Sequence, residues 1–145
     1  MDKYDLMQRL MLRAPFYLSR LVVAELKKHG QGGAIGNMAS IHGHICTVGK
    51  AAYNVVKFGI RGLTQSIAAE GDGKIRAFSV STGFVRTGLV LRQIPAQAQA
   101  RGISEEEVIR DVMLGKSRNK EMMKPVEVAN LFIFGFSRFS RYLNG

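Results

Sequence analysis

Hydrophobic residues recur at helical spacing along the first part of the chain, residues 3–28. The positions that form this pattern are Leu6, Leu10, Leu18, Leu21, Val22 and Leu26. The segment ends in KKHGQGG, a cationic last turn followed by glycine, which is typical of a helix C-terminus. Pro15 lies in the middle of the segment and removes a backbone donor, so we expect it to kink the helix or divide it in two.

Three later segments also carry patterns that predict helices. In residues 50–70 the spacing predicts an inward face made of Ala52, Val55, Val56, Ile60, Leu63 and Ile67. Residues 103–115 predict a helix that is opened by Ser104. A Glu lies three positions after this serine, which is the pattern of a capping box. Residues 124–138 have Pro125 in the first turn, where a helix tolerates proline.

Two short apolar segments predict buried strands. They are AIGNMAS at residues 34–40, which Gly36 weakens, and KIRAFSVS at residues 74–81. Helices alternate with these strands, and that order favours a parallel α/β arrangement with flanking helices. Two parallel strands make a small sheet with an open edge, so we expect one partial α/β domain covering residues 1–145.

Composition and charge narrow the classes of protein to consider. The chain is 46% hydrophobic and 22% charged, which is typical of a globular protein, and its net charge is +10. The basic residues are scattered, and the densest cluster, at residues 116–124, also contains an acidic residue. No nucleic-acid-binding motif accompanies the charge, so it does not favour nucleic acid as a partner.

Two further features bear on the cellular compartment. Cys46 is the only cysteine, so no internal disulfide forms, in agreement with a reducing compartment. The N-terminal residues lack the apolar core of a signal peptide, and the longest apolar run, residues 131–136, is far too short to span a bilayer. We therefore expect a cytoplasmic protein that does not use a membrane.

Tyr53 and Lys57 are the first candidates for chemistry. Four residues apart on a helix, they share a face, and an ammonium close to a phenol favours the phenolate. A tyrosine in that setting exchanges protons with an alcohol or carbonyl oxygen. The pair alone is common by chance. Ser40 strengthens it, because this residue ends the first strand, where its hydroxyl would point into the crevice at the edge of a parallel sheet.

The segments NMAS, KAAYNVVK and STGFVRTGLV together resemble the C-terminal half of short-chain dehydrogenases/reductases. The resemblance implies that Ser40 positions the substrate oxygen and that Tyr53 is the proton donor or acceptor. It implies that Lys57 binds the nicotinamide ribose and tunes the tyrosine. The resemblance implies a nicotinamide cofactor, which we expect to be NAD, with NADP as the alternative. TGFVRT matches the family's stretch beside the nicotinamide, with Gly83, Val85 and Thr87 as cofactor contacts and Thr82 replacing a proline.

A narrower resemblance concerns the substrate. SIHG, GKAAY, LVLRQI and GISEEEVIRDVML resemble segments of the D-3-hydroxybutyrate dehydrogenases. This resemblance implies that His42, Lys50 and Gln93 bind the carboxylate of a small hydroxy or keto acid, with 3-hydroxybutyrate and acetoacetate as the reacting pair. Without the resemblance, each residue has a simpler interpretation. His42 would be a loop residue, Lys50 a surface residue at a helix start, and Gln93 a polar residue in an exposed turn.

The resemblance also implies a partial Rossmann-type fold. The family's first strand and Gly-rich turn, which hold the cofactor pyrophosphate, precede the matched region, so we expect the N-terminal half to be missing. We accordingly expect very weak or absent NAD binding by the isolated chain, and its activity is in doubt. The alternative function is a catalytically inactive fragment or an interaction module of the same family. In the family, helices matching residues 3–28 and 51–70 form a dimer, which implies a homo-oligomer.

Some positions depart from the family pattern. Met11 stands where the family often has an asparagine that organises a water molecule. Gly36 stands where a branched apolar residue would fill the core, and we expect a poorly filled site there. Lys124 stands where a threonine would cap the last helix, and losing such a cap costs about 0.5–2 kcal/mol.

Overall fold

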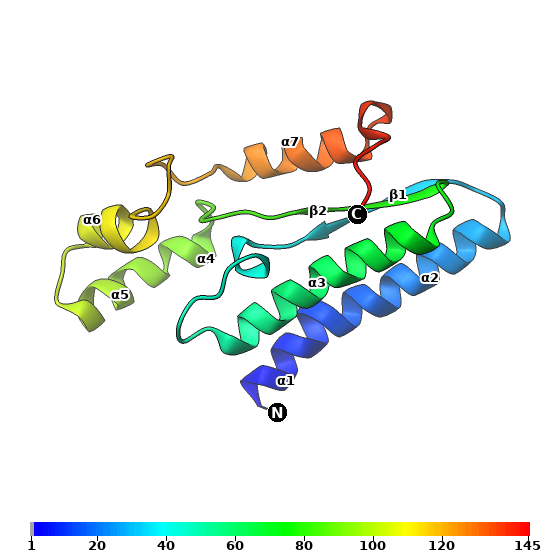
Figure 1. The fold of residues 1–145 in the computed structure, drawn as a ribbon. Helices are drawn as coiled ribbons and strands as arrows, with labels where there is room; N and C mark the ends of the chain where they lie inside the picture. The colour runs from blue at the N-terminus through cyan, green and yellow to red at the C-terminus, as the bar shows by residue number, and fades with distance from the viewer. Residues whose placement is uncertain (1) are drawn as a thin grey trace. The chain divides into compact units, whose positions relative to one another are not determined.

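The computed structural model describes residues 2–145 and divides them into two compact units, shown in Figure 1. The first unit consists of residues 2–81 together with residues 131–145, and the second consists of residues 82–130. Within residues 2–145, no helix is both long and apolar enough to cross a membrane.

The first unit begins with the interrupted helix that the sequence predicts. Helix α1 (Lys3–Gln8) leads into a wide π turn at Arg9–Arg13, and α2 (Ala14–Lys28) follows. Pro15 lacks the N–H that would bond to the carbonyl of Met11, so the regular hydrogen-bond pattern is changed in the turn that precedes it.

A two-stranded parallel sheet forms the centre of this unit. Strand β1 (Gly33–Met38) pairs with β2 (Ile75–Val80), with Gly33 opposite Ile75 and Met38 opposite Val80. Helix α3 (Ala51–Glu70) connects the strands and lies beside α2 on one side of the sheet (Figure 1). The core between them consists of Ile67, Ile75 and Ala77 with Val23, Leu26, Ile35, Leu63 and Ala68 packed around them. The α/β class and the parallel pairing are therefore as predicted.

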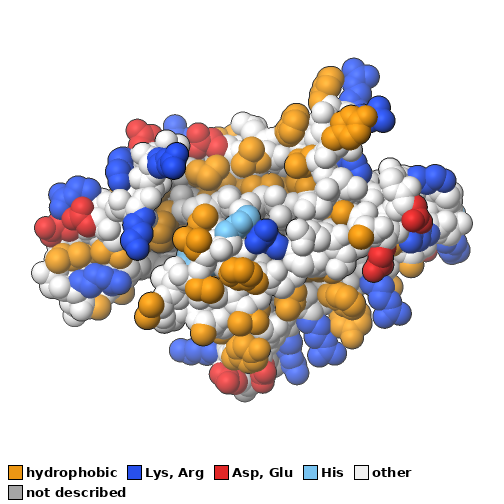
Figure 2. Space-filling model, viewed as in Figure 1, with side chains coloured by type: hydrophobic (Ala, Val, Ile, Leu, Met, Phe, Trp, Pro, Cys, Tyr) orange, Lys and Arg blue, Asp and Glu red, His pale blue; other side chains and the backbone are white. Residues whose placement is uncertain are grey.

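One of the predictions about the inward face of α3 is wrong. Val55 is 52% exposed, whereas Val56 and Ile60 are buried. The sheet covers only one face of the helix, and Val55 lies outside the stripe of residues that this face contains. Several hydrophobic residues of α1, of the π turn and of α2 are exposed as well, namely Leu6, Leu10, Leu18, Leu21 and Val22. Figure 2 shows hydrophobic side chains among lysines and arginines over this part of the molecule.

Gly36 does not leave the poorly filled site that the sequence suggests. A Cβ atom at this position would come within 2.8 Å of Phe78 and 2.9 Å of Phe136. The aromatic rings occupy the space that a branched side chain would fill, with the rings of Phe78 and Phe136 5.1 Å apart, centre to centre. The expectation was wrong because large residues on neighbouring elements compensate for the small one on β1.

The C-terminal residues cover the other side of the sheet. Helix α7 (Pro125–Phe136) ends in this unit, and a short 3-10 helix (Arg138–Ser140) follows. Arg76 of β2 donates hydrogen bonds to the carbonyls of Gly135, Ser137, Ser140 and Leu143, at 3.0 to 3.5 Å. Ala77 is bonded on its outer edge by the amide of Gly145 and the side chain of Asn144. The last residues of the chain thus occupy part of the strand edge that was expected to be open.

The second unit is a small helical cluster. It contains α4 (Gly88–Leu91), α5 (Gln93–Arg101), α6 (Glu105–Glu107) and a π turn at Val108–Met113. Its core consists of Ile94, Val108, Met113 and Leu114. The predicted capping box at the start of α6 is confirmed, but α4 and α5 were not predicted, because Ala and Gln alternate in α5 without a clear hydrophobic stripe.

Lys124 precedes α7 and was expected to leave that helix uncapped. The backbone N–H of Lys124 donates to the Glu127 carboxylate at 2.6 Å. This bond is one half of a capping box, so a neighbouring side chain replaces part of what a threonine would supply.

Candidate active site

Ser40 lies two residues past the end of β1. Beyond the last residue of β1, the backbone N–H of Ala39 still donates to Val80 at 2.9 Å, so the strand pairing carries the chain up to the serine. Ser40 is buried, and its hydroxyl oxygen accepts the N–H of His42 at 3.2 Å. That bond caps a 3-10 helix at Ile41–Gly43, so the serine has a fixed position where the strand ends.

Tyr53 and Lys57 lie on one face of α3, as their spacing predicts. The Nζ atom of Lys57 is 5.5 Å from the centre of the Tyr53 ring. Lys57 is buried, and it donates a 3.0 Å hydrogen bond to the carbonyl of Met38, the last residue of β1. Burial lowers the pKa of the Lys57 ammonium, because the charged form loses its hydration. The lysine thus joins the helix to the end of the strand.

His42 contacts both Ser40 and Tyr53. Its Nδ1 atom is 3.3 Å from the Ser40 hydroxyl, and its ring meets the Tyr53 ring edge to face, with centres 5.5 Å apart. Burial lowers the pKa of His42, and the positive charge of Lys50 lowers it further. A neutral histidine beside the serine is therefore favoured, and the ring can donate or accept one hydrogen bond on each nitrogen.

The loop between the 3-10 helix and α3 is held by residues that the sequence did not single out. Arg61 of α3 donates to the carbonyl of Gly43 at 2.6 Å. A Cβ atom on Gly43 would lie 2.6 Å from the carbonyl oxygen of Lys57, so only glycine allows the loop to approach α3 this closely. Asn54 donates to the carbonyl of Thr47 at 3.1 Å. Isolated polar residues on a helix give no sequence signal for such contacts.

His44 and Cys46 lie in the same loop. The Nε2 atom of His44 is 3.0 Å from the hydroxyl of Ser81, which follows β2. Cys46 is exposed, with a free thiol. Among residues 2–145, no three His, Cys, Asp or Glu side chains come together in a way that would hold a metal ion.

Lys50 is exposed and stands directly before α3, in the first unit. The remaining predicted residues belong to the second unit. Val85 forms a parallel bridge with Met123, and Gly83, just before it, is exposed. The Thr87 hydroxyl accepts the N–H of Val90 at 3.4 Å and caps α4, which leaves its own O–H as a donor. Gln93 is the first residue of α5 and is exposed, so it lies in a helix and not in the turn that the simpler interpretation suggested.

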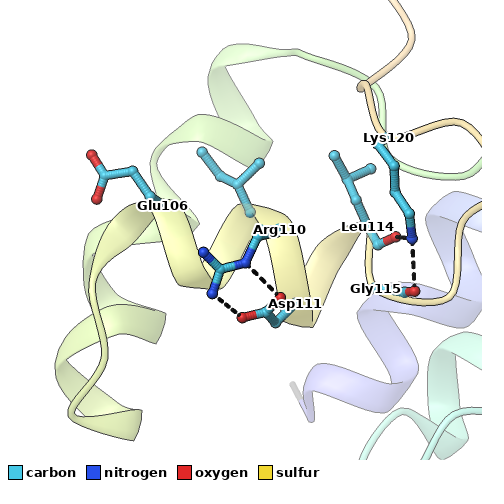
Figure 3. A pocket seen from close by; sticks show the side chains of 7 residues that line it. Glu106, Arg110, Asp111, Leu114, Gly115 and Lys120 are labelled. Carbon is cyan, nitrogen blue, oxygen red and sulfur yellow. Dashed lines mark hydrogen bonds and ion pairs between the residues drawn. The ribbon is translucent and has the colours of Figure 1, made fainter.

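A hollow lies in the second unit, and none of the predicted residues lines it. Its volume is about 500 Å³, and its lining residues are Glu106, Ile109, Arg110, Asp111, Leu114, Gly115 and Lys120. Figure 3 shows three of its charged groups bonded to their neighbours: Arg110 makes two bonds to Asp111, and Lys120 donates to the carbonyls of Leu114 and Gly115. These bonds occupy polar atoms that a ligand would otherwise contact.

A smaller hollow of about 290 Å³ lies in the first unit, beside β2. Its lining residues are His44, Arg61, Gln65, Phe78, Ser79, Ser81, Leu143 and Gly145. None of the residues predicted to bind substrate or cofactor lines it. The side chains suited to carry out a reaction are therefore those of Ser40, His42, Tyr53 and Lys57. In this group a hydroxyl, an imidazole and a phenol lie beside a buried ammonium.

Comparison with known proteins gives matches over the whole chain. The family model described as Enoyl-(Acyl carrier protein) reductase matches residues 1–145. The D-beta-hydroxybutyrate dehydrogenase of Rhizobium meliloti (strain 1021) is 37% identical over 134 residues, covering 92% of this chain and 52% of that protein. The enzyme of the same name from Cupriavidus necator is 32% identical, covering 99% of this chain and 56% of that protein. The chain thus spans about half the length of the curated relatives it matches.

Solved structures of similar fold are also known. The sorbitol-6-phosphate 2-dehydrogenase SrlD from Erwinia amylovora matches with a TM-score of 0.89 and 26% identity, covering 97% of this chain and 56% of that one. The L-sorbose reductase of Gluconobacter frateurii, complexed with NADPH and L-sorbose, matches with a TM-score of 0.85 and 25% identity, covering 97% and 53%. A 4-hydroxyisoleucine dehydrogenase complexed with NADH matches with a TM-score of 0.81 and 26% identity, covering 97% and 55%.

Proposed function

Because the chain belongs to the short-chain dehydrogenase/reductase family of oxidoreductases, we propose that it contributes the proton-transfer and substrate-binding residues of an NAD-dependent 3-hydroxybutyrate dehydrogenase. The reaction interconverts 3-hydroxybutyrate and acetoacetate. The observation that carries the proposal is the convergence of Ser40, His42, Tyr53 and Lys57 at the end of β1.

Tyr53 is the acid/base of the proposed reaction. In the oxidation direction, its phenolate accepts the proton of the substrate hydroxyl as the adjacent C–H bond gives up its hydride. The ammonium of Lys57 lies 5.5 Å from the ring centre, so its positive charge is next to the phenol. Ser40 donates a hydrogen bond to the reacting oxygen and holds it against the phenol, and the backbone N–H of His42, which donates to the serine oxygen, keeps that hydroxyl in place.

Lys57 fits the nicotinamide end of a dinucleotide. An ammonium has three N–H donors, and the bond to Met38 uses one of them, so the others can serve ribose hydroxyls. Gly83, Val85 and Thr87 are the further residues proposed to contact the cofactor. The bound nicotinamide accepts or supplies the hydride. Two structural relatives are complexed with NADPH and with NADH, which supports a nicotinamide cofactor; NAD is our proposal.

The substrate carboxylate is the part of the ligand that three of the predicted residues suit. His42, Lys50 and Gln93 offer hydrogen-bond donors, and Lys50 adds a positive charge. The lowered pKa of His42 keeps its imidazole neutral near pH 7, so it can donate to a carboxylate oxygen without a fixed charge of its own. Two relatives named D-beta-hydroxybutyrate dehydrogenase support a small hydroxy acid as the substrate.

The test is a joined protein in which this chain replaces its matching region in the Rhizobium meliloti relative. We expect NAD-dependent oxidation of 3-hydroxybutyrate, and we expect Tyr53→Phe to lower kcat by about 10²–10⁴-fold, because the general acid/base is lost. The matched control is Tyr142→Phe, at an exposed tyrosine outside the site, which should leave kcat unchanged. A folded joined protein that binds NAD yet oxidises no 3-hydroxybutyrate would refute the proposal.

We further propose that the chain self-associates through α1, α2 and α3. Hydrophobic residues are exposed on these helices, including Leu18, Leu21 and Val55, and such surfaces favour association. Association without catalysis is also what an inactive fragment or interaction module of the family would show. The activity of the joined protein separates the two functions, because only the enzyme requires Tyr53.

A further inference from the structure

Asn54 occupies a position that its packing alone does not explain. The residue is 7% exposed, directly after Tyr53 on α3. Its Nδ2 atom donates to the carbonyl of Thr47 at 3.1 Å. Its Oδ1 atom is buried and has no hydrogen-bond partner within residues 2–145. Such an acceptor is destabilising, so a hydrophobic residue of similar size would suit the position better if packing were the only requirement.

The carbonyl that Asn54 holds belongs to the loop that carries two of the proposed substrate contacts. His42 and Lys50 stand near the two ends of this loop, and residues 44–50 between them are exposed. An exposed segment has little packing to fix it, so hydrogen bonds to the adjacent helix decide where it lies. Arg61 holds the first part of the loop through Gly43, and Asn54 holds the second part through Thr47.

Thr47 is connected directly to Lys50. The carbonyl of Thr47 accepts the N–H of Lys50 at 3.3 Å, in addition to the side chain of Asn54. The carbonyl of Lys50 in turn accepts the backbone N–H of Asn54 at 2.8 Å. The asparagine is therefore bonded both to Lys50 and to the residue that fixes Lys50, and it is covalently next to Tyr53.

We propose that Asn54 is a positioning residue, which fixes Lys50 relative to Tyr53 by holding the Thr47 carbonyl against α3. This role deepens the proposed function and rests on it, since Lys50 is there a contact of the substrate carboxylate. The amide donor is the necessary group. The buried acceptor accompanies it because an asparagine side chain carries both.

The first test uses the 145-residue chain by itself and needs no activity. Cys46, the only cysteine and exposed, stands directly before Thr47, so a nitroxide spin label attached to it reports loop motion by electron paramagnetic resonance. We expect Asn54→Leu to shorten the rotational correlation time of the label at least about twofold, because the loop loses its fixed point. The control is Ser66→Ala, which removes a side-chain hydrogen bond to the carbonyl of Gly62 elsewhere on α3.

Asn54→Asp supplies a second variant of nearly the same shape, in case the leucine variant does not fold. Its ionised carboxylate has no donor and repels the Thr47 carbonyl, so the label should be mobile at neutral pH. On acidification the carboxyl regains an O–H, and the label should slow again, whereas a residue needed only for its shape would show no such rescue. Folded variants whose labels move as in the parent chain at neutral pH would overturn the proposal.

The second test uses the joined protein with 3-hydroxybutyrate. We expect Asn54→Leu to raise KM about tenfold while kcat stays within about twofold, because Lys50 binds the carboxylate and takes no part in proton transfer. An equal loss in kcat with KM unchanged would overturn the positioning role. If the joined protein with Asn54 intact is inactive, the proposed function fails, and the spin-label spectra still decide whether Asn54 holds the loop.

Discussion

His42 is a residue of the candidate site whose pKa is changed by its surroundings. It is partly buried, contacts Ser40 and Tyr53, and lies within the field of Lys50. Both burial and the neighbouring charge disfavour its protonated form, and burial is the larger cause. The sequence alone left His42 open between a substrate contact and an ordinary loop residue, and neither interpretation includes a changed pKa.

The lowered pKa of His42 makes stability depend on pH. The unfolded chain protonates this histidine near its usual value of about 6.5, whereas the folded chain protonates it only at lower pH. The stability that the neutral ring provides is thus present above about pH 6.5 and is lost as the pH falls through the folded pKa. Urea unfolding between pH 7 and pH 5 should show a steeper loss in the parent chain than in His42→Gln, and equal slopes would contradict this.

Lys50→Met separates the two causes of the pKa shift. Removing the charge should raise the pKa of His42 toward its usual range, but only in part, because burial is the larger cause and remains. The measurement is an NMR titration of the His42 ring, with His29 as an internal reference distant in sequence and exposed. A complete return to the usual value would mean that the lysine, and not burial, dominates.

At the residue scale, the sequence predicted the contacts that regular geometry produces. Tyr53 and Lys57 share a helix face because they are four residues apart, and Ser40 lies at the site because it ends a strand. Asn54 and Arg61 were missed, since each acts through a hydrogen bond to a loop carbonyl, and no spacing rule places a loop. The role of each predicted site residue stays a prediction until activity is measured.

At the scale of elements, the missing side chain at Gly36 of β1 leaves room for aromatic rings of β2 and α7. A methyl group at this position would come within 3.0 Å of three phenylalanine rings, those of Phe78, Phe132 and Phe136. We expect Gly36→Ala to lower the free energy of unfolding by about 1–3 kcal/mol through overpacking. The control is Gly62→Ala on α3, where no atom lies within 4 Å, and which should stabilise by about 0.4–1 kcal/mol. Urea unfolding measures both, and a stabilising Gly36→Ala would show that the rings move aside.

Arg76 attaches the C-terminal segment to β2. Its guanidinium donates hydrogen bonds to four carbonyls between residues 135 and 143. We expect Arg76→Met to cost about 2–4 kcal/mol in unfolding free energy, because bonds to a charged donor are strong and several carbonyls lose their partner. Hydrogen exchange should also accelerate in residues 135–145. Unchanged exchange there would mean that Asn144 and Gly145 hold the segment by themselves.

The elements that the sequence predicted are those with strong local signals. Residues 50–70 have an uninterrupted hydrophobic period and form α3, and the capping box at Ser104 begins α6. Helix α5 lacks such a period and was missed. Its buried residue, Ile94, packs with Val108 and Met113, so tertiary contacts within the second unit stabilise a helix whose own pattern is weak.

At the scale of the whole molecule, the parallel pair and its helices reproduce part of the family fold. Relatives and solved structures match nearly the whole chain, whereas the chain spans only 52–56% of the two D-beta-hydroxybutyrate dehydrogenases. The helix pattern predicted α1 and α2 but not how much of their hydrophobic surface is exposed, because a pattern shows that a face is apolar and not what covers it. The exposed face is the physical basis for the proposed self-association.

Self-association should depend on the exposed leucines of α2. Leu18 and Leu21 are each 64% exposed, and burying a leucine side chain contributes about 1.5–3 kcal/mol, roughly a tenfold change in a dissociation constant or more. Light scattering coupled to size exclusion should give a mass above 16.0 kDa for the parent chain and a lower mass for the variant with Leu18→Glu and Leu21→Glu. Leu89→Glu is the matched control, since Leu89 is also 64% exposed but lies in the second unit. An equal effect of the double variant and of Leu89→Glu would indicate general hydrophobic aggregation, and a monomeric parent chain would exclude the interface.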